Sequence, residues 1–453
     1  MSQRKLPSEW CNAKVGDIVP YGKTQKCVLS DVSDSTWVLE LEDVEKESSR
    51  ILARKTAAER PFKSTKNMFN KGNVLYGKLR PYLNKVVLAD EYGVCTTEII
   101  PLDAEPFVLN RYLFYWLKSH DFLSYVNEVS YGVNMPRLGT KDGVTAPIVL
   151  APLAEQKIIA NKLDTLLAQV DNTKARLERI PEILKRFRQS VLAAAVSGRL
   201  TEEWRGFNNS QFPYERRQFA KIILEMRNGL STKPNEHGLG HPILRISSVR
   251  PFSVDQVDIR YLEVSERDKE RYSLQPDDLL FTRYNGSIDF VGVCARVKEL
   301  DHNTLLYPDK LIRVRVDKKQ IIPSFLELFS ASYEAREYIY SLVKSTSGQK
   351  GISGKDLKLM EVELPSILEQ TEIVRRVDQL FAHAARIEQQ ANQALARVNN
   401  LTQSILAKAF RGELTEQWRK DNPELISGEN SAEALLERIK AEQIAVKQTR
   451  GRG

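Results

Sequence analysis

Two groups of basic, aromatic and amide side chains have the chemistry needed to bind DNA. The group in the second half of the chain consists of Arg283, Tyr284, Asn285, Ser287, Lys344, Ser347, Gln349, Lys350 and Lys355. The group in the first half consists of Lys71, Tyr76, Lys78, Arg80, Tyr131, Asn134, Arg137 and Lys141. Arginine can donate two hydrogen bonds to guanine and asparagine can pair with adenine, whereas lysines and hydroxyls suit phosphates. Any single one of these residues can equally be a solvated surface side chain, so the prediction of DNA contact depends on the sets.

No catalytic or metal-binding constellation accompanies these residues. Gly22-Lys23-Thr24 resembles part of a phosphate-binding loop, but the earlier glycine stands at 16 where the motif needs 17, and Gly354-Lys355 is followed by Asp356. The five histidines lack metal-ligand spacing, and the four cysteines form no C-x-x-C pair. We therefore expect a binding protein with no catalytic residues, no metal and no cofactor of its own.

The composition of the chain fits a protein that binds DNA. The chain of 453 residues carries a net charge of +8, which favours a polyanion, and its 42% hydrophobic residues suffice for two or more cores. The N-terminus lacks the apolar segment of a signal peptide, and no stretch approaches the length of a transmembrane helix. We expect a cytoplasmic protein with reduced cysteines.

An internal repeat organises the chain. Residues 190–205 and 404–419 are identical at ten of sixteen positions, at an offset of 214. The same offset relates Glu155-Gln156 to Glu369-Gln370 and Lys141-Asp142 to Lys355-Asp356. Such self-similarity predicts two copies of one structural unit.

Each repeat contains a heptad stripe typical of a coiled coil. Stepping alternately by four and three residues meets Ile159, Leu163, Leu166, Val170, Leu177, Leu184 and Phe187 in the first copy, and Val377, Leu380, Ile387, Leu401 and Ile405 in the second. This spacing keeps one face of each helix against a partner helix. The alternative is two unrelated amphipathic helices, each lying on its own globule.

If a pseudo-twofold axis relates the copies, the two helices run antiparallel. Leu184 then faces Ala384, Leu177 faces Ala391 and Thr173 faces Ala394, so that large residues meet small ones. Thirty-six helical residues make a rod of about 53 Å. Pro181 should interrupt the first helix because proline lacks the amide donor. We expect Arg188, on the rod, to meet phosphate or an acidic partner surface.

The segments outside the repeats differ in sequence but share the same order of predicted elements. Each has apolar strands (72–78 in the first, 277–283, 290–295 and 311–316 in the second), then an aromatic-rich helical stretch (112–126; 325–342), then a Gly/Ser-rich loop (130–143; 345–356). The predicted fold class is α+β, with two mixed α/β globules separated by two long helices that form an intramolecular antiparallel coiled coil. The predicted segments are 1–152, 153–206, 207–364, 365–425 and a C-terminal helix with a basic tail at 426–453.

The chain resembles the specificity subunits of type I restriction–modification enzymes. The resemblance rests on Leu153-Ala154-Glu155-Gln156 and Leu368-Glu369-Gln370 at the helix starts, on residues 6–10 (Leu-Pro-Ser-Glu-Trp), and on the run at 404–414. It covers nearly the whole chain, and the closeness of the repeats suggests the enteric type IA group.

This resemblance implies two target-recognition domains, each reading one half of a split, asymmetric double-stranded DNA site, with the coiled coil setting the spacer. It implies two methyltransferase subunits that bring S-adenosylmethionine and two motor–nuclease subunits that use ATP and Mg, and no membrane. From the residues alone, two alternatives stay open. A two-headed DNA-binding regulator would need an effector site or a helix-turn-helix signal, and neither is evident. A coiled-coil scaffold would not need paired basic loops.

Overall fold

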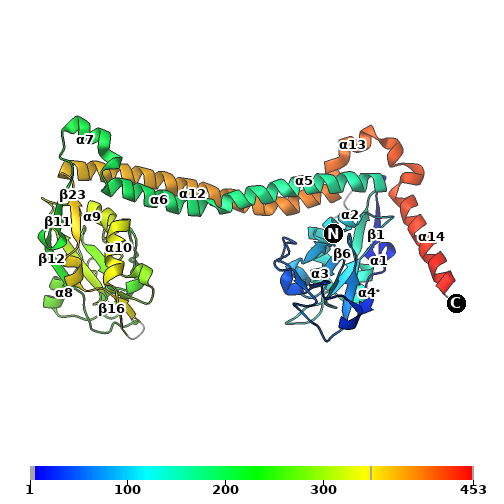
Figure 1. Cartoon of the computed structure of the whole chain (residues 1–453), viewed down its shortest axis with the longest axis horizontal. Helices are drawn as coiled ribbons and strands as arrows, with labels where there is room; N and C mark the ends of the chain where they lie inside the picture. The colour runs from blue at the N-terminus through cyan, green and yellow to red at the C-terminus, as the bar shows by residue number, and fades with distance from the viewer. Residues whose placement is uncertain (1–5, 347–348, 451–453) are drawn as a thin grey trace. The chain divides into compact units, whose positions relative to one another are not determined.

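The computed structural model describes residues 6–346 and 349–450, and its chain divides into two compact units (Figure 1). Unit 1 consists of Met1–Leu177 and Gln393–Gly453, and unit 2 of Glu178–Asn392. Each unit holds one globule together with a part of both long helices. The helices do not form a unit of their own, because Ile159, Leu163 and Leu406 belong to the apolar core of the first globule. No helix within the described residues is long and apolar enough to cross a membrane.

Unit 1 combines three small sheets with a layer of helices. The sheets have the strand orders β2-β5-β8-β3-β4, β7-β6-β9 and β1-β10. The strands are β1 (Cys11–Lys14), β2 (Lys26–Cys27), β3 (Trp37–Leu39), β4 (Lys55–Thr56), β5 (Lys66–Phe69), β6 (Val74–Gly77), β7 (Val86–Leu88), β8 (Gly93–Cys95), β9 (Ile99–Leu102) and β10 (Pro147–Leu150). The helices are α1 (Val15–Ile18), α2 (Asn110–Leu117), α3 (His120–Val129), α4 (Thr140–Thr145), α5 (Leu153–Glu178), α13 (Glu416–Asp421) and α14 (Ala432–Arg450).

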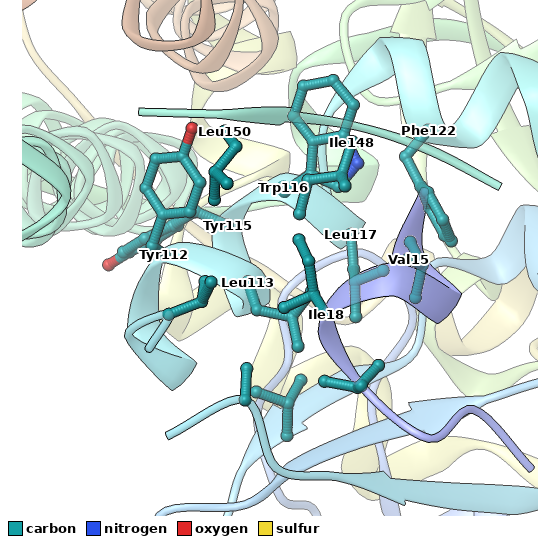
Figure 2. Packing of buried hydrophobic residues seen from close by; sticks show 14 of the residues in the cluster. Val15, Ile18, Tyr112, Leu113, Tyr115, Trp116, Leu117, Phe122, Ile148 and Leu150 are labelled. Carbon is teal, nitrogen blue, oxygen red and sulfur yellow. The ribbon is translucent and has the colours of Figure 1, made fainter. Parts of the chain in front are cut away.

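The core of unit 1 forms around α2. Its apolar residues recur at three- and four-residue spacing, so Tyr112, Leu113 and Trp116 point inward together with Val15 of α1 and Ile148 of β10 (Figure 2). The aromatic-rich stretch is two helices rather than one. The hydroxyl of Ser119 accepts a hydrogen bond from the amide of Phe122 and so caps the start of α3.

Unit 2 repeats this plan with a different sheet. Its main sheet has the order β12-β20-β17-β19, and smaller sheets pair β11 with β23, β13 with β16, β14 with β15, and β22 with both β18 and β21. The strands are β11 (Glu215–Gln218), β12 (Ile223–Asn228), β13 (His241–Leu244), β14 (Val249–Arg250), β15 (Ser253–Val254), β16 (Ile259–Leu262), β17 (Leu279–Thr282), β18 (Tyr284–Asn285), β19 (Cys294–Arg296), β20 (Leu311–Val316), β21 (Lys344–Thr346), β22 (Gln349–Gly351) and β23 (Glu361–Leu364). The helices are α6 (Ile180–Val196), α7 (Glu202–Asn208), α8 (Glu266–Tyr272), α9 (Pro323–Ser330), α10 (Tyr333–Leu342), α11 (Gly354–Lys358) and α12 (Ile367–Phe410), the last of which continues into unit 1.

Several expected segments differ in detail from the observed ones. Residues 290–293 are not a strand, because β19 begins only at Cys294. The two Gly/Ser-rich loops contain regular structure: the first holds α4, and the second holds β21, β22 and the start of α11. Glycine and serine suit the turns and helix caps of such compact segments as well as open loops.

The two long helices pair in antiparallel fashion within each unit. In unit 1 the side chain of Lys162 in α5 donates to the carbonyl of Leu414, beyond the end of α12, at 2.7 Å. In unit 2 Arg188 in α6 meets Glu388 in α12 at 2.7 Å, and Arg376 donates to the carbonyl of Leu200 at 2.8 Å. Residue numbers therefore rise along one helix as they fall along the other, which confirms the predicted coiled coil.

Most predicted seam positions are buried or half-buried. Leu184 and Ala384, expected to face each other, are both buried, as are Ile159, Leu163 and Val377. Two expectations were wrong. Leu401 is 43% exposed, and Thr173 is exposed, with its hydroxyl bonded to the carbonyl of Gln169 in its own helix.

Pro181 interrupts the first helix as expected. Helix α5 ends at Glu178 and α6 begins at Ile180, with proline in the first turn of α6. Arg179 between them keeps right-handed helical angles (φ −84°, ψ −18°), so the interruption is a loss of hydrogen bonding without a change of backbone conformation.

The repeated sequence builds two equivalent buried networks. In unit 1 Glu155 accepts hydrogen bonds from the indole of Trp10 at 2.7 Å and from Thr415 and Arg419 at 2.5 Å each. Arg419 also donates to the carbonyl of Gly412, which has φ +75°. A carboxylate at the start of one repeat thus binds the end of the other repeat.

Unit 2 contains the matching network around Glu369. Thr201, Arg205 and Tyr214 each donate to its Oε1 at 2.8 Å. Arg205 donates to the carbonyl of Gly198, as Arg419 does to that of Gly412. The repeat is therefore conserved between the two halves because each end needs the same partners.

The glutamine that follows each glutamate anchors a globule to the rod. Gln156 accepts from the amide of Leu109, at the start of α2, at 3.0 Å and donates to the carbonyl of Ala151. Gln370 likewise accepts from the amide of Ile322, at the start of α9, at 2.8 Å. Both side chains are buried, so each fixes the first aromatic helix of its globule against a long helix.

Candidate nucleic-acid interface

In unit 2 the predicted DNA-binding residues come together on one small sheet. Strand β18 pairs with β22, with Tyr284 opposite Gly351 and Asn285 opposite Lys350. Strand β22 pairs in turn with β21, which places Lys344 opposite Gly351. We call this sheet, with Arg283 before it, the hairpin surface of unit 2. Ser347 lies outside the described residues.

The backbone of Arg283 is held on both sides. Its amide donates to the carbonyl of Lys310 at 2.7 Å, and its carbonyl accepts from the amide of Ile352 at 3.0 Å. The guanidinium lies 4.7 Å from the ring centroid of Tyr284, within cation–π distance. A Cβ at Gly351 would lie 2.3 Å from this ring, so only glycine lets the ring lie against the hairpin. The two backbone hydrogen bonds and the contact with the Tyr284 ring thus hold the guanidinium of Arg283 in a defined position.

Asn285 and Ser287 shape the turn that follows. The Asn285 side-chain oxygen accepts from the amide of Ser287 at 3.1 Å, and the Ser287 hydroxyl donates to Asp289 at 3.2 Å. The Asn285 oxygen keeps a second lone pair and its NH2 group keeps its donors, which are the groups that pair with adenine. The hydroxyl proton of Ser287 is therefore already engaged in a hydrogen bond within the loop.

Several cations around this surface have no carboxylate partner. Among the described residues, no ion pair involves Arg250, Arg283, Lys310, Arg336, Lys350 or Lys355. Arginines of the main sheet behave differently: Arg296 pairs with Asp277, and Arg315 pairs with Asp278. A concentration of unpaired cations attracts an anionic partner.

Three of these cations were missed by the sequence analysis. The Arg250 guanidinium lies 4.6 Å from the ring centroid of Phe290, and Arg336 donates to the carbonyl of Asp289 at 3.1 Å. The carbonyl of Lys310 holds Arg283. All three come from segments distant in sequence, so no local pattern marks them.

Helix α11 presents Lys355 through a capping box. The hydroxyl of Ser353 accepts from the amide of Asp356 at 3.2 Å and donates to its carboxylate at 2.6 Å. These bonds with Ser353 hold the pKa of Asp356 below its ordinary value, with a further contribution from the positive charge of Lys344. Asp356 therefore stays ionised, and it stabilises the start of this short helix.

Unit 1 builds an equivalent surface from a segment beside β6. Tyr131 and Arg137 exchange backbone hydrogen bonds at 3.2 and 2.9 Å, and Leu79 forms a bridge with Arg137. The amide of Arg80 donates to the carbonyl of Pro136 at 2.7 Å. We call residues 78–80 with 131–138 the hairpin surface of unit 1.

The two surfaces occupy the same place in their globules. Each combines the residues after a core strand (β6 or β17) with a hairpin that follows the second aromatic helix (α3 or α10) and precedes a short helix (α4 or α11). Lys141 in α4 and Lys355 in α11 are exposed, at the repeat offset of 214.

Arg80 has a left-handed backbone (φ 50°), which is strained for a residue with a side chain. Strain of this kind collects at functional sites, where surrounding bonds maintain it. Arg137 pairs with Glu98 at 3.2 Å and remains partly exposed. Asn134 is exposed, and Lys78 contributes its carbonyl to the amide of Leu138.

Two predicted contacts lie elsewhere. Tyr76 is 2% exposed and packs edge-to-face with Phe122, so its prediction as a DNA contact was wrong. Burial raises the pKa of its hydroxyl. Lys71 is exposed, but it lies in the turn before β6, at the opposite end of that strand from Lys78. Arg188, expected to meet phosphate or an acidic partner surface, pairs with Glu388 of its own chain and stays partly exposed, so that expectation stays a prediction.

Comparison with known proteins gives a consistent result. Residues 7–182 and 230–397 match the family model described as type I restriction modification DNA specificity domain. The specificity subunit of the type I restriction enzyme EcoKI of Escherichia coli (strain K12) is 59% identical over 344 residues, covering 76% of this chain and 74% of the relative. The StySPI specificity subunit of Salmonella potsdam is 44% identical over 342 residues, covering 76% and 73%.

Solved structures share the fold. One, from a study of complex assembly and conformational transition of the type I R-M system, has a TM-score of 0.68 at 18% identity and covers 90% of this chain and 99% of that chain. The HsdS subunit from Thermoanaerobacter tengcongensis has a TM-score of 0.61 at 18% identity and covers 91% and 99%.

Proposed function

Because the chain belongs to the family of type I restriction–modification DNA specificity subunits, we propose that each of its two hairpin surfaces reads one half of a bipartite, asymmetric DNA target. The observation that supports this most directly is the occurrence of the same arrangement once in each unit. A strand end and a hairpin present amide, aromatic and cationic side chains in both places. A coiled-coil scaffold would not need two such surfaces.

Base reading and phosphate binding fall to different residues in this proposal. Arg283 carries its charge on a backbone fixed by two hydrogen bonds, which suits a bidentate contact with guanine. Lys344, Lys350 and Lys355 carry mobile point charges that suit phosphates. In unit 1 base reading falls to Arg137 and Asn134. Phosphate binding there falls to Lys78, Arg80 and Lys141.

The coiled coil sets the length of the spacer between the two half-sites and docks the other subunits. The partners are two methyltransferase subunits that use S-adenosylmethionine and two motor–nuclease subunits that use ATP and Mg. The chain supplies recognition and no catalytic group, and the complex acts in the cytoplasm. Purified chain incubated with S-adenosylmethionine and DNA transfers no methyl groups, and turnover without partner subunits contradicts this division of labour.

Sequencing of methylated sites gives the target directly. A host expressing the chain with its methyltransferase subunit acquires methylation at one bipartite sequence. Replacing residues 207–364 with those of a relative changes one half of that sequence and leaves the other half intact. A change in both halves contradicts independent reading.

Substitution of Arg283 separates base reading from phosphate binding. Arg283→Ala lowers affinity for the cognate duplex by about 1–3 kcal/mol and relaxes discrimination within one half-site. Lys355→Ala weakens cognate and random duplexes alike and reduces the salt slope by about one. Competition binding of the assembled methyltransferase against single-base variants measures both effects. If Arg283→Ala weakens cognate and random DNA equally, base reading in unit 2 passes to another residue, with Gln349 next.

Membership of the type IA group is a separate proposal, supported by the identity to the Escherichia coli and Salmonella relatives. The methyltransferase subunit of the EcoKI system then forms an active enzyme with this chain. Failure of the mixed complex to methylate DNA, while the native pair does so, counts against the assignment.

A further inference from the structure

The tip of the unit 1 hairpin exposes apolar side chains where the rest of the surface is polar. Val133 is fully exposed, Met135 is 50% exposed and Tyr131 is 62% exposed. The Tyr131 ring lies against Gly139, where a Cβ would come within 3.2 Å of it. Val133 and Met135 are therefore the exposed aliphatic side chains of this tip.

The backbone beneath this tip is well held. Tyr131 and Arg137 close the hairpin with two hydrogen bonds, and Pro136 accepts from the amide of Arg80. Gly132 has φ +108°, which permits the turn that displays Val133. The two apolar side chains thus sit on a supported base, beside the cations Arg80 and Arg137.

The surroundings of the tip indicate what it contacts. A protein interface depletes charge at its centre, whereas this tip belongs to the hairpin that also carries Asn134 and Arg137 of the proposed DNA-binding surface. Apolar side chains at such a position need an apolar group on DNA. The base edges of the major groove carry one such group, the C5 methyl of thymine.

The unit 2 hairpin offers a contrast. Its described residues are Lys344, Ser345, Thr346, Gln349, Lys350 and Gly351, none of them large and apolar. Both half-sites therefore meet hydrogen-bonding groups, and the half-site bound by unit 1 meets exposed apolar side chains as well.

We propose that Val133 and Met135 read one or two thymine methyl groups in the half-site bound by unit 1. This inference rests on the proposed function, because it takes the hairpin surface of unit 1 to face DNA. It adds a specificity determinant that acts by van der Waals contact and desolvation, independently of hydrogen bonding.

Removal of single methyl groups from DNA tests the inference. The probe is a duplex carrying the sequence found by sequencing methylated sites, with each thymine of the unit 1 half-site replaced in turn by deoxyuridine. Base pairing and charge are unchanged, so only the methyl group is lost. The complex of the chain with its methyltransferase subunit binds one or two of these duplexes about fourfold more weakly than the thymine duplex.

Variants at the tip then lose this distinction. Val133→Ala or Met135→Ala brings the thymine-to-deoxyuridine affinity ratio at one position to about one, because the side chain that meets the methyl is gone. Val257→Ala removes an equally conspicuous valine of unit 2, 88% exposed, and keeps the wild-type ratio. Deoxyuridine in the unit 2 half-site serves as the matched DNA control and behaves the same with wild type and both tip variants.

The possible failures are distinguishable. If the wild-type complex is insensitive to deoxyuridine throughout the unit 1 half-site, or that half-site contains no A·T pair, the inference is overturned while target recognition stands. If the tip variants weaken all duplexes equally and keep the ratio, the tip has a structural or backbone role and the inference is again overturned. If the wild-type complex does not distinguish the target from a random duplex, the proposed function itself fails.

Discussion

Lys118 offers the sharpest test of how unit 1 is stabilised, because it is a buried cation that forms no ion pair with any carboxylate in the described part of the chain. Its ammonium group donates to the hydroxyl of Ser49 at 2.6 Å and lies 5.1 Å from the ring centroid of Phe114. Burial lowers its pKa from 10.5 to about 8, although the charge of Asp171 acts in the opposite direction. Folding therefore disfavours the charged form of Lys118.

The size and sign of the effect follow from this shift. A depressed lysine pKa means that the folded state carries a cost that is fully present below about pH 8 and disappears as the pH rises to 10.5. At 1.36 kcal/mol per pKa unit, the cost near pH 7 is about 3 kcal/mol. Lys118→Met removes it but also removes the hydrogen bond to Ser49, worth about 1–1.5 kcal/mol. The variant should be more stable than wild type by about 2 kcal/mol near pH 7, and equal to it near pH 9.5.

Urea unfolding at the two pH values measures this difference. Four of the five tryptophans belong to unit 1, so fluorescence reports mainly on that unit. Lys46→Met, at an exposed lysine of the same unit, should show no pH-dependent difference from wild type. A Lys118→Met variant that is less stable than wild type near pH 7, or whose advantage is the same at both pH values, refutes the reasoning.

Three further predictions concern the network around Glu369, the hairpin surface of unit 2 and the coiled coil. Glu369→Gln leaves Arg205 buried without its charge partner and should destabilise unit 2 by about 3–5 kcal/mol in urea unfolding; an unchanged midpoint contradicts a structural role for the network. Gly351→Ala forces Tyr284 away from the hairpin and should reduce discrimination among single-base variants of one half-site with little change in far-UV circular dichroism; wild-type discrimination argues against a positioning role for the ring. Inserting four residues after Val170 lengthens the helix by about 6 Å and should lengthen the spacer of the methylated target or abolish binding. A functional protein with an unchanged spacer contradicts the proposal that the coiled coil sets the spacer length.

Periodic features were predictable from the sequence because they are local. The heptad stripe from Ile159 onward identified the coiled coil, and Pro181 identified its interruption, since both depend on spacing or on a single residue. The error at Leu401 has a similar origin. A heptad pattern assigns a face to every helical residue, but burial requires a partner side chain at that level of the rod.

Long-range contacts set the limit of prediction at the candidate interface. The predicted contacts were grouped into two sets, but the bridge from Leu79 to Arg137 and the pairing of Asn285 with Lys350 join residues more than fifty positions apart, and local sequence does not reveal such pairs. Tyr76 is an example of the resulting error. Its hydroxyl suggested a position on the surface, whereas its place in strand β6 directs the ring toward Phe122. The buried roles of Glu155 and Glu369 were also missed, because a repeated sequence reveals that a contact is required and not which residues meet.

The network around Glu155 also determines how the chain responds to mechanical force. Trp10 near one end of the chain and Arg419 near the other bind the same carboxylate, and α14 packs beside α1 through the bond from Gln443 to the carbonyl of Asp17. Tension applied between Trp10 and Gln443 is carried first by these bonds, which act in parallel. The polypeptide between residues 156 and 414, which includes all of unit 2, lies outside the load path until they break. Tension between residues 10 and 443 therefore reaches the hairpin surface of unit 2 only after these bonds have broken.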